Sequence, residues 1–454
     1  MLLEIERLLA RGIGASSRLF RAGGGTTLPG KVLWKAHPGA IDRLASELPE
    51  GAVLVSATNG KTTTAAMAAA ILRSRHRLAH NSSGANLVSG IASTLLSSPG
   101  AELGLFEVDE AALPEAARRV RPRTVLLGNH FRDQLDRYGE LEHVAERWRS
   151  ALSSLPETAL VANADDPLLG DIALAHPGAV RTFGLDDHRH ARPSLQHAAD
   201  SKYCHECGRP FLYAAAYVGH LGEYACPVGH LRRPRLDVAA REIELHGLDG
   251  TTFELATPEG SATVHLALPG LYNVYNAVAA AALAGELGAP VPEIAAGLEA
   301  FTAAVGRFER IAVGDRRVLM LLVKNPAGAN EAVRTLLEGS PPALAVVALN
   351  DEIADGRDVS WIWDVDFEPL LASLERVIVS GGRAAELALR FAYGGLDRAR
   401  IDVVPELERA LDRGLDATPA GGELVLLPTY TAMLALRRII ARRGYVADYW
   451  EAAA

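Results

Sequence analysis

Short apolar runs alternate with helical segments along the first half of the chain. These runs cover residues 52–56, 103–108, 124–127 and 159–162. Apolar runs of this length, separated by helical segments, are typical of buried parallel strands with crossover helices. The pattern returns at residues 318–323, 343–349, 377–379, 401–404 and 424–427. The chain is therefore predicted to contain two α/β domains with mainly parallel sheets.

Three other segments depart from this pattern. Residues 1–46 begin with an amphipathic stretch and pass through a glycine-rich turn, which predicts a helix and an arm packed on the body. Residues 201–235 are rich in Cys, His, Gly and Pro, which indicates an insertion held by something other than an apolar core. Residues 236–267 alternate between apolar and polar positions, as antiparallel strands do. We expect a central domain over 47–311 and a C-terminal domain over 312–454.

Composition narrows the class of protein. The 454 residues are 49% hydrophobic and 22% charged, which indicates ordinary globular cores and excludes disorder over most of the length. A net charge of −9 provides no overall attraction to nucleic acid, so no nucleic-acid partner is expected. Charged residues interrupt the N-terminal apolar stretch, so no secretory signal is expected. We predict a cytoplasmic location, with a peripheral position at the inner face of the membrane as the alternative.

The segment after the first apolar run has the features of a phosphate-binding loop between a strand and an Ala-rich helix. Gly60 permits close approach of the backbone, Lys61 supplies charge to the β- and γ-phosphates, and the Thr62 hydroxyl suits Mg²⁺. Position 55 is Val, so the first glycine of the usual eight-residue pattern is absent. A simple turn before a helix is the alternative, which the strand-to-helix context disfavours. The predicted nucleotide-binding residues here are Thr58, Asn59, Gly60, Lys61, Thr62 and Thr63.

This loop resembles the ATP loop of the Mur ligase family, Gly-Thr-x-Gly-Lys-Thr, with Ala57 in place of the first Gly. Glu107 lies where that family has a Mg²⁺-binding Glu. The family also has an Asn pair and a Gly-Arg-x-Glu element beside the nucleotide, which correspond here to Asn273, Asn276 and Arg307. The resemblance implies ATP and Mg²⁺, with Lys61 and Glu107 acting in catalysis. It also implies a P-loop central domain with a parallel sheet, followed by a Rossmann-like α/β C-terminal domain.

Longer stretches are similar to one branch, the MurT family. They are residues 80–87, 131–140, 163–167, 324–330 and 355–361. Gln134 replaces the His of the Asp-His-Leu-Asp sequence found in amino-acid-adding Mur ligases. His130 could approach the nucleotide or the metal, but a packed core histidine is the favoured interpretation. This resemblance implies ATP-dependent amidation of the D-Glu α-carboxylate of lipid II, through an acyl phosphate, to give D-isoglutamine.

The cysteines predict a zinc ribbon. All three lie between residues 204 and 226, and their turns have the form of a ribbon that presents ligands to one tetrahedral ion. The MurT resemblance implies a four-cysteine ribbon, but Gly229 stands where the fourth Cys would be. We therefore predict structural zinc held by Cys204, Cys207, Cys226 and His230. His205 and His220 are weaker candidates for the fourth ligand, and a redox Cys pair or a ribbon that has lost its metal are the alternatives.

An acidic segment at 350–368 contains two tryptophans. Large aromatic side chains are costly to expose, so we expect this segment to pack against another surface rather than to form a solvated loop. The MurT resemblance implies that this segment faces GatD, a glutaminase partner with a Cys-His pair. It further implies that Asp358 completes the triad, with Asp355 as the alternative. Ammonia would then come from the GatD subunit.

Two other functions are alternatives for this sequence. A free-standing Mur or folylpolyglutamate-type amino-acid ligase is disfavoured by Gln134, the ribbon and the acidic segment. A zinc-ribbon NTPase that binds nucleic acid is disfavoured by the acidic net charge. Two basic stretches, 231–235 and 436–444, could contact lipid phosphates, but a solvated surface is favoured for both.

Overall fold

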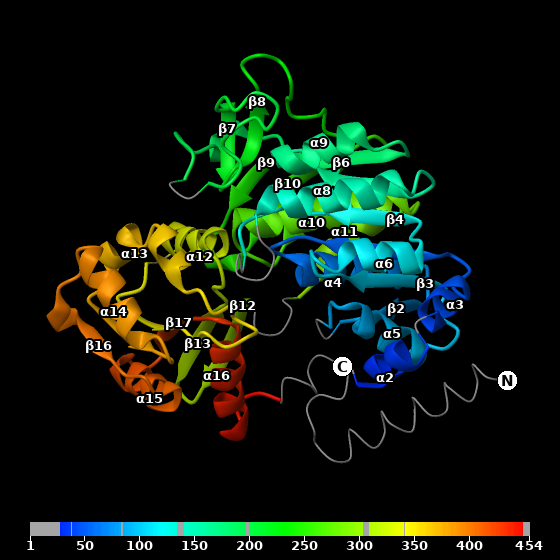
Figure 1. Ribbon diagram of the computed structural model, residues 1–454. Coiled ribbons are helices and arrows are strands. Elements are labelled where there is room, and N and C mark those ends of the chain that lie inside the picture. Colours follow the sequence, from blue (N-terminus) through cyan, green and yellow to red (C-terminus); the bar gives the residue numbers. More distant parts are fainter. Residues whose placement is uncertain are drawn as a thin grey trace.

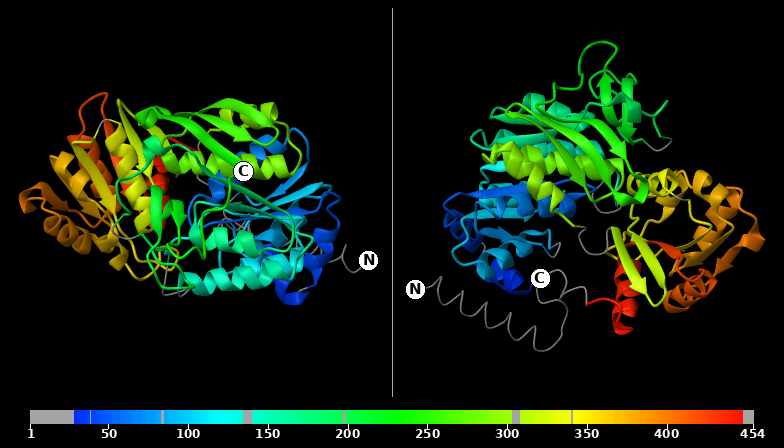
Figure 2. Two further views of the ribbon diagram at one scale, coloured as in Figure 1. Left: turned by 90° about the horizontal axis from the view of Figure 1, so that it is seen from above. Right: turned by 180° about the vertical axis from the view of Figure 1, so that it is seen from behind.

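The computed structural model describes residues 28–37, 39–82, 85–133, 140–196, 199–302, 308–339 and 341–447. The N-terminal amphipathic stretch, Gln134 and Arg307 lie outside these ranges. The described chain forms two α/β bodies on separate sheets, and the C-terminal body lies to one side of the central body in every view (Figures 1 and 2).

The central domain is built on a nine-stranded sheet in the order β11-β10-β9-β6-β5-β4-β1-β3-β2. Its strands are β1 (Ala52–Ser56), β2 (Leu78–His80), β3 (Leu103–Glu107), β4 (Thr124–Leu127), β5 (Ala159–Asn163), β6 (Val180–Leu185), β9 (Val238–Leu245), β10 (Thr251–Thr257) and β11 (Gly260–Leu266). The first six of these strands pair in parallel, β9 continues the sheet parallel to β6, and β10 pairs antiparallel with both β9 and β11. The predicted parallel runs and the antiparallel region are confirmed.

Helices cover both faces of this sheet because successive strand residues point to opposite sides. Val53 and Val55 of β1 face a core shared with α4 (Lys61–Leu72), α10 (Leu271–Glu286) and α11 (Val291–Glu299). Leu54 faces the other core. The helices of that second layer are α2 (Leu28–Ala36), α3 (Ala40–Ser46), α5 (Val88–Ser97), α6 (Leu113–Val120), α8 (Leu141–Ser153) and α9 (Pro167–Ala175).

The insertion forms an antiparallel hairpin of β7 (Leu212–Val218) and β8 (Leu221–Ala225), which projects from the central domain (Figure 1). The sequence predicted an insertion held by something other than an apolar core, and it did not predict the small apolar cluster that the structure shows. Phe211, Tyr224 and Leu231 form a small buried cluster with two of the cysteines. The hairpin side that carries Tyr217 joins the main core of the central domain.

The C-terminal domain contains a six-stranded sheet in the order β12-β13-β17-β14-β15-β16. Its strands are β12 (Phe308–Val313), β13 (Arg316–Leu321), β14 (Leu344–Ala348), β15 (Arg376–Ser380), β16 (Ile401–Val403) and β17 (Glu423–Pro428). All of its pairs are parallel except β12 with β13, and β12 spans the boundary expected between 311 and 312.

Helices also cover both faces of the second sheet. One layer contains α12 (Pro326–Glu338), α13 (Glu368–Ser373) and α14 (Ala384–Tyr393), and the other contains α15 (Leu407–Ala417) and α16 (Tyr430–Arg442). Among all the helices in the described ranges, none is both long enough and apolar enough to cross a membrane.

Candidate active site

The phosphate loop joins β1 to α4, as its sequence predicted. Gly60 caps α4 with φ 82°, a left-handed conformation that favours glycine. A Cβ at this position would lie 2.0 Å from Asn276 Oδ1, so only glycine fits. Asn276 in turn donates to Asn273 Oδ1 at 3.1 Å, which places the predicted Asn pair of α10 directly against the loop.

Lys61 is buried, and its ammonium nitrogen lies 2.8 Å from Glu110 Oε2. Burial opposes the charge on Lys61, but Glu110, Glu107 and Asp109 outweigh burial, so the pKa of Lys61 is raised. Burial likewise opposes the charge on Glu110, but Lys61 and Lys324 hold its pKa below the ordinary value. Both groups are therefore charged at neutral pH. Sequence reasoning missed Glu110, although it follows strand β3 at the edge where the loop lies.

Thr62 and Glu107 form the oxygen pair expected to hold magnesium. The Thr62 hydroxyl donates to Glu107 Oε2 at 2.7 Å, and Glu107 is buried. Asn81 fixes the backbone of Glu107 by accepting from its N–H at 2.8 Å and donating to its carbonyl at 2.9 Å. A hydroxyl and a carboxylate in contact at the end of a phosphate loop fit the oxygen ligands that Mg²⁺ prefers.

Two more asparagines hold the loop from both domains. Asn129 accepts from the Asn59 N–H and donates to the Asn59 carbonyl, each at 2.9 Å. The side chains of Asn59 and Asn325 exchange hydrogen bonds at 3.2 and 3.0 Å, and Asn325 is also the N-cap of α12. Lys324 donates to the Thr58 carbonyl at 3.2 Å. Sequence reasoning assigned no site role to Asn129, Lys324 or Asn325.

A cavity lies between the two domains beside Gly60. Most of its wall is apolar, and polar groups converge from the loop, from α10 and from α12. Its lining includes Asn59, Gly60, Thr63, Asn273, Asn276, Leu268, Phe308, Leu321, Lys324, Ala327 and Glu331. Glu331 Oε1 accepts from Arg192 at 3.1 Å, and burial raises the pKa of Glu331. An apolar slot with a few fixed polar groups next to a phosphate loop suits a nucleotide base.

A second pocket adjoins this cavity, and Lys324 lines both of them. Its other walls come from the loop after β4 and from the acidic segment near η3 (Ser360–Asp364). The lining residues are Arg132, Asp133, Lys324, Asn325, Pro326, Asp355, Asp358, Ser360, Trp361 and Asp364. Lys324 is therefore shared by the cavity beside the phosphate loop and the pocket that contains the candidate triad residue Asp358.

The two candidate triad carboxylates differ in their surroundings. Asp355 is buried and accepts from the backbone and hydroxyl of Thr431 at 2.8 and 2.5 Å. Asp358 is exposed and accepts from the Ser360 N–H at 2.8 Å, and this bond lowers the pKa of Asp358. Asp358 is thus the carboxylate available to a partner.

His130 is a packed core histidine, the interpretation favoured from its sequence. It is 2% exposed, its Nε2 lies 3.0 Å from the Leu141 carbonyl, and its ring centroid lies 4.8 Å from that of Trp148. Burial lowers its pKa, so it is neutral at physiological pH. Its neighbour Asn129 contacts the phosphate loop instead.

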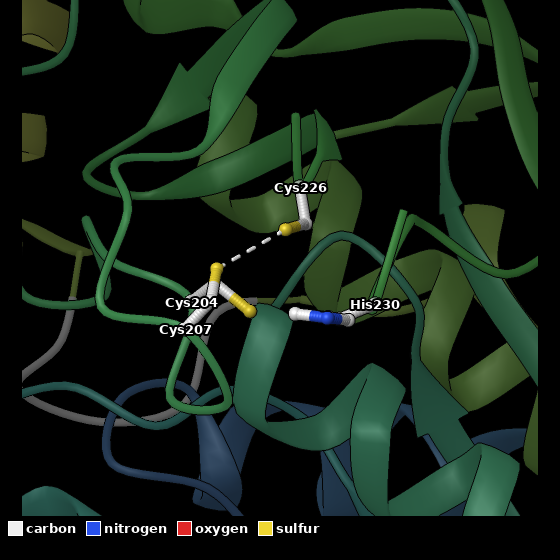
Figure 3. Close-up of side chains that lie close together, drawn as sticks. All are labelled: Cys204, Cys207, Cys226 and His230. Atoms are coloured by element: carbon white, nitrogen blue, oxygen red, sulfur yellow. Dashed lines mark hydrogen bonds between the residues drawn. The ribbon is translucent and has the colours of Figure 1, made fainter. Parts of the chain in front are cut away.

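The ribbon turns bring four metal-ligand atoms together. One donor atom from each of Cys204, Cys207, Cys226 and His230 lies within 4.8 Å of the others, and their side chains converge in Figure 3. The other two histidine candidates point elsewhere. His205 Nε2 lies 3.3 Å from Asp171 Oδ2, and His220 Nε2 lies 3.3 Å from Asp166 Oδ2. Three thiols and one imidazole on two turns are a donor set that fits tetrahedral zinc.

The chain matches two descriptions of protein families. The Mur ligase middle domain matches residues 55–212, and the MurT ligase C-terminal domain matches residues 322–433. The chain is 32% identical to the lipid II isoglutaminyl synthase (glutamine-hydrolyzing) subunit MurT of Streptococcus pneumoniae, over 98% of this chain and 99% of that protein. It is also 32% identical to the protein of the same name from Staphylococcus aureus, over 95% and 94% of the two chains.

Solved structures share the fold at lower identity. A pseudomurein peptide ligase type C from Methanothermus fervidus superposes with a TM-score of 0.70 at 22% identity, over 88% of this chain and 80% of that one. The MurF ligase of Thermotoga maritima in complex with ADP gives a TM-score of 0.64 at 16% identity, over 94% and 84% of the two chains. The fold is therefore that of peptide ligases built on a phosphate-loop domain and a C-terminal α/β domain.

Proposed function

Because this chain belongs to the MurT family of Mur ligases, we propose that it is the ligase subunit of a lipid II isoglutaminyl synthase. The reaction is ATP-dependent amidation of the D-Glu α-carboxylate of lipid II to D-isoglutamine, at the inner face of the membrane. One observation carries this proposal. Lys61, Thr62 and Glu107 carry the charge and oxygen ligands of a phosphate loop, and Gly60 and Thr63 of the same loop line the cavity between the domains. Lys324 lines both this cavity and the pocket that contains Asp358.

The geometry supports phosphoryl transfer to a carboxylate. The first turn of α4 and Lys61 bind the phosphates, while Asn273, Asn276 and the cavity walls hold the nucleoside. The γ-phosphoryl group passes to the substrate carboxylate, which gives an acyl phosphate and ADP. Ammonia then attacks the carbonyl carbon, and inorganic phosphate leaves. Thr62 and Glu107 would hold Mg²⁺, which neutralises charge on the phosphate oxygens when bound. Thr58, Asn59, Gly60, Thr63 and Arg307 complete the proposed nucleotide set.

The purified chain should convert lipid II to the amide with ATP and ammonium, but not with glutamine. Amide hydrolysis requires an activated nucleophile such as a thiolate, and all three cysteines belong to the ribbon. The measurement is mass spectrometry of the lipid II peptide, with ADP release as a second signal. Glutamine-supported amidation by the single chain would overturn the two-subunit proposal. Addition of an amino acid instead of ammonia would favour the folylpolyglutamate-type alternative.

The ammonia donor is proposed to be a GatD-type glutaminase bound at the acidic segment. Asp358 is exposed next to the second pocket, while both oxygens of Asp355 are occupied by Thr431. A carboxylate from one chain can orient a catalytic histidine of another, because the role requires only a hydrogen bond to the imidazole.

The ribbon is proposed to hold one structural zinc ion through Cys204, Cys207, Cys226 and His230. Four protein ligands close the coordination shell, so the ion contributes to folding and not to catalysis. In sites of this kind metal binding contributes on the order of 10 kcal/mol to folding.

Protein prepared without chelator should contain about one zinc per chain, as expected for a closed four-ligand site. His230→Ala should lower the zinc content and the thermal stability of the ribbon. His205→Ala is the matched control, because His205 lies in the same insertion but points to Asp171. Inductively coupled plasma mass spectrometry gives the metal content. If His230→Ala keeps its full zinc content while His205→Ala loses zinc, the fourth ligand is His205. If no sample contains zinc, the proposed zinc site is wrong.

A further inference from the structure

Asp133 carries a buried carboxylate oxygen that nothing in the proposed mechanism yet uses. Its side chain is 8% exposed, and Oδ2 pairs with the Lys324 ammonium group. Oδ1 is buried and has no hydrogen-bond partner among the described residues. Leaving a buried carboxylate oxygen without a donor costs free energy, so this oxygen is suited to a ligand that can donate to it.

Asp133 lies near both the phosphate loop and the pocket that contains Asp358. It lines the second pocket together with Asp358, which is exposed, whereas Asp133 itself is enclosed. Its partner Lys324 also lines the nucleotide cavity and donates to the Thr58 carbonyl of the phosphate loop. Asp133 therefore contacts a lysine that reaches the phosphate loop, and it shares a pocket with Asp358.

The charges of this pocket favour a small cation. Four carboxylates line it, from Asp133, Asp355, Asp358 and Asp364, against two cationic side chains. Both cations are engaged, Lys324 with Asp133 and Arg132 with Asp364 at 3.4 Å and with Asp200, so Asp355 and Asp358 are the lining carboxylates outside these ion pairs. In a partly enclosed site the remaining negative charge raises the local concentration of cations.

We propose that this pocket receives ammonium and that Asp133 Oδ1 is the general base that converts it to ammonia. The inference rests on the amidation proposed above. Ammonium gives one proton to the Asp133 carboxylate, and the freed electron pair attacks the carbonyl carbon of the acyl phosphate. The C–N bond forms while the C–O bond to phosphate breaks. The nitrogen then gives a proton to the departing phosphate, and Asp133 returns its own proton to solvent.

The surroundings of Asp133 suit this role. Burial raises the pKa of Asp133, and the nearby Glu110 carboxylate acts in the same direction, while Lys324 and Lys61 oppose them without reversing the shift. A carboxylate whose pKa lies closer to the working pH is a better proton acceptor in catalysis. The other buried acids nearby are committed, since Glu110 pairs with Lys61 and Asp355 accepts twice from Thr431.

The test compares two nucleophiles on the enzyme assembled with its glutaminase partner, without glutamine. At neutral pH ammonia is almost entirely ammonium, whereas hydroxylamine is almost entirely unprotonated and needs no base to attack an acyl phosphate. Asp133→Asn should lower the ammonium-dependent rate about 10²-fold or more, the usual contribution of a general base. Its hydroxylamine-dependent rate, measured as lipid II hydroxamate, should stay within a few-fold of the wild-type rate.

Two further variants separate base chemistry from structure. Lys324→Met keeps the carboxylate but removes the cation that lowers its pKa, so more of Asp133 should be protonated at neutral pH. Its ratio of ammonium to hydroxylamine rates should therefore fall below that of the wild type at neutral pH, and this deficit relative to the wild type should shrink as the pH is raised. Asp133→Ser is the second test of the base and should give the same low ratio as Asp133→Asn. The role of Asp133 as a base is overturned if both Asp133 variants keep the wild-type ratio of ammonium to hydroxylamine rates. This holds whether the two rates fall together or neither of them changes. Wild-type enzyme that forms neither amide nor hydroxamate overturns the amidation function itself.

Discussion

Lys61→Met should abolish ATP-dependent amidation. The substitution removes the cation that faces the β- and γ-phosphates, and loss of one preorganised charge contact in a transition state costs about 10²-fold or more. It also leaves Glu110 charged and buried without its partner, because the two groups form an ion pair at 2.8 Å with both side chains enclosed. Breaking such a pair from one side costs about 3–5 kcal/mol of stability. The variant should therefore be both inactive and less stable.

The double variant Lys61→Met, Glu110→Gln separates these two effects. It removes both charges, so the free energy of unfolding should recover most of its wild-type value while amidation stays absent. Denaturant unfolding measures the stability, and ADP release with lipid II and ammonium measures the activity. A Lys61→Met protein with activity within about threefold of wild type would contradict the charge contact assigned to the phosphate loop.

Asp358→Asn should abolish the use of glutamine while ammonium-dependent amidation persists. The neutral side chain cannot stabilise the imidazolium that forms during amide hydrolysis, so glutamate release by the assembled complex should fall by about 10²-fold or more. Asp358 is exposed, so solvent and salt screen its charge from the phosphate loop. Glutamate release is the assay, and gel filtration checks that the complex still forms.

Asp355→Asn is the matched control, because it makes the same substitution in the same segment. Asp355 accepts two hydrogen bonds from Thr431, so its variant should lose stability and affect both amide donors alike. Unchanged glutamate release from an intact Asp358→Asn complex would make Asp358 an ordinary surface acid. Loss of ammonium use in that variant would place Asp358 in the ligase site.

Local features of the fold were predictable from the sequence, and long-range ones were not. Buried parallel strands are apolar on both faces, so β1, β3, β4 and β5 could be located as continuous runs. The phosphate loop is one contiguous segment whose chemistry depends on its own backbone. By contrast, the bonds that join Asn59 to Asn325 link residues 266 positions apart, and only the packing of two domains brings them together.

The same distinction applies within the candidate sites. The ribbon ligands were predictable because each pair lies on one short turn, and the structure brings His230 rather than His205 or His220 to the cysteines. Glu110 could not be identified as the partner of Lys61, because the acidic run after β3 gives no indication of which carboxylate turns toward the loop. The small apolar cluster of the ribbon was missed because its members are separated by polar turns.

The nucleotide cavity has walls from both domains, since Gly60 and Asn276 come from one and Phe308 and Glu331 from the other. A compound that fills it would therefore contact both bodies, and separation of the bodies would break the contacts on one side. Its residence time would be governed by domain opening, a motion of microseconds to milliseconds in enzymes of this kind, more than by the strength of any single contact. Inhibitors directed at this cavity should thus be ranked by dissociation rate, since equilibrium affinity alone would undervalue those that hold the two domains together.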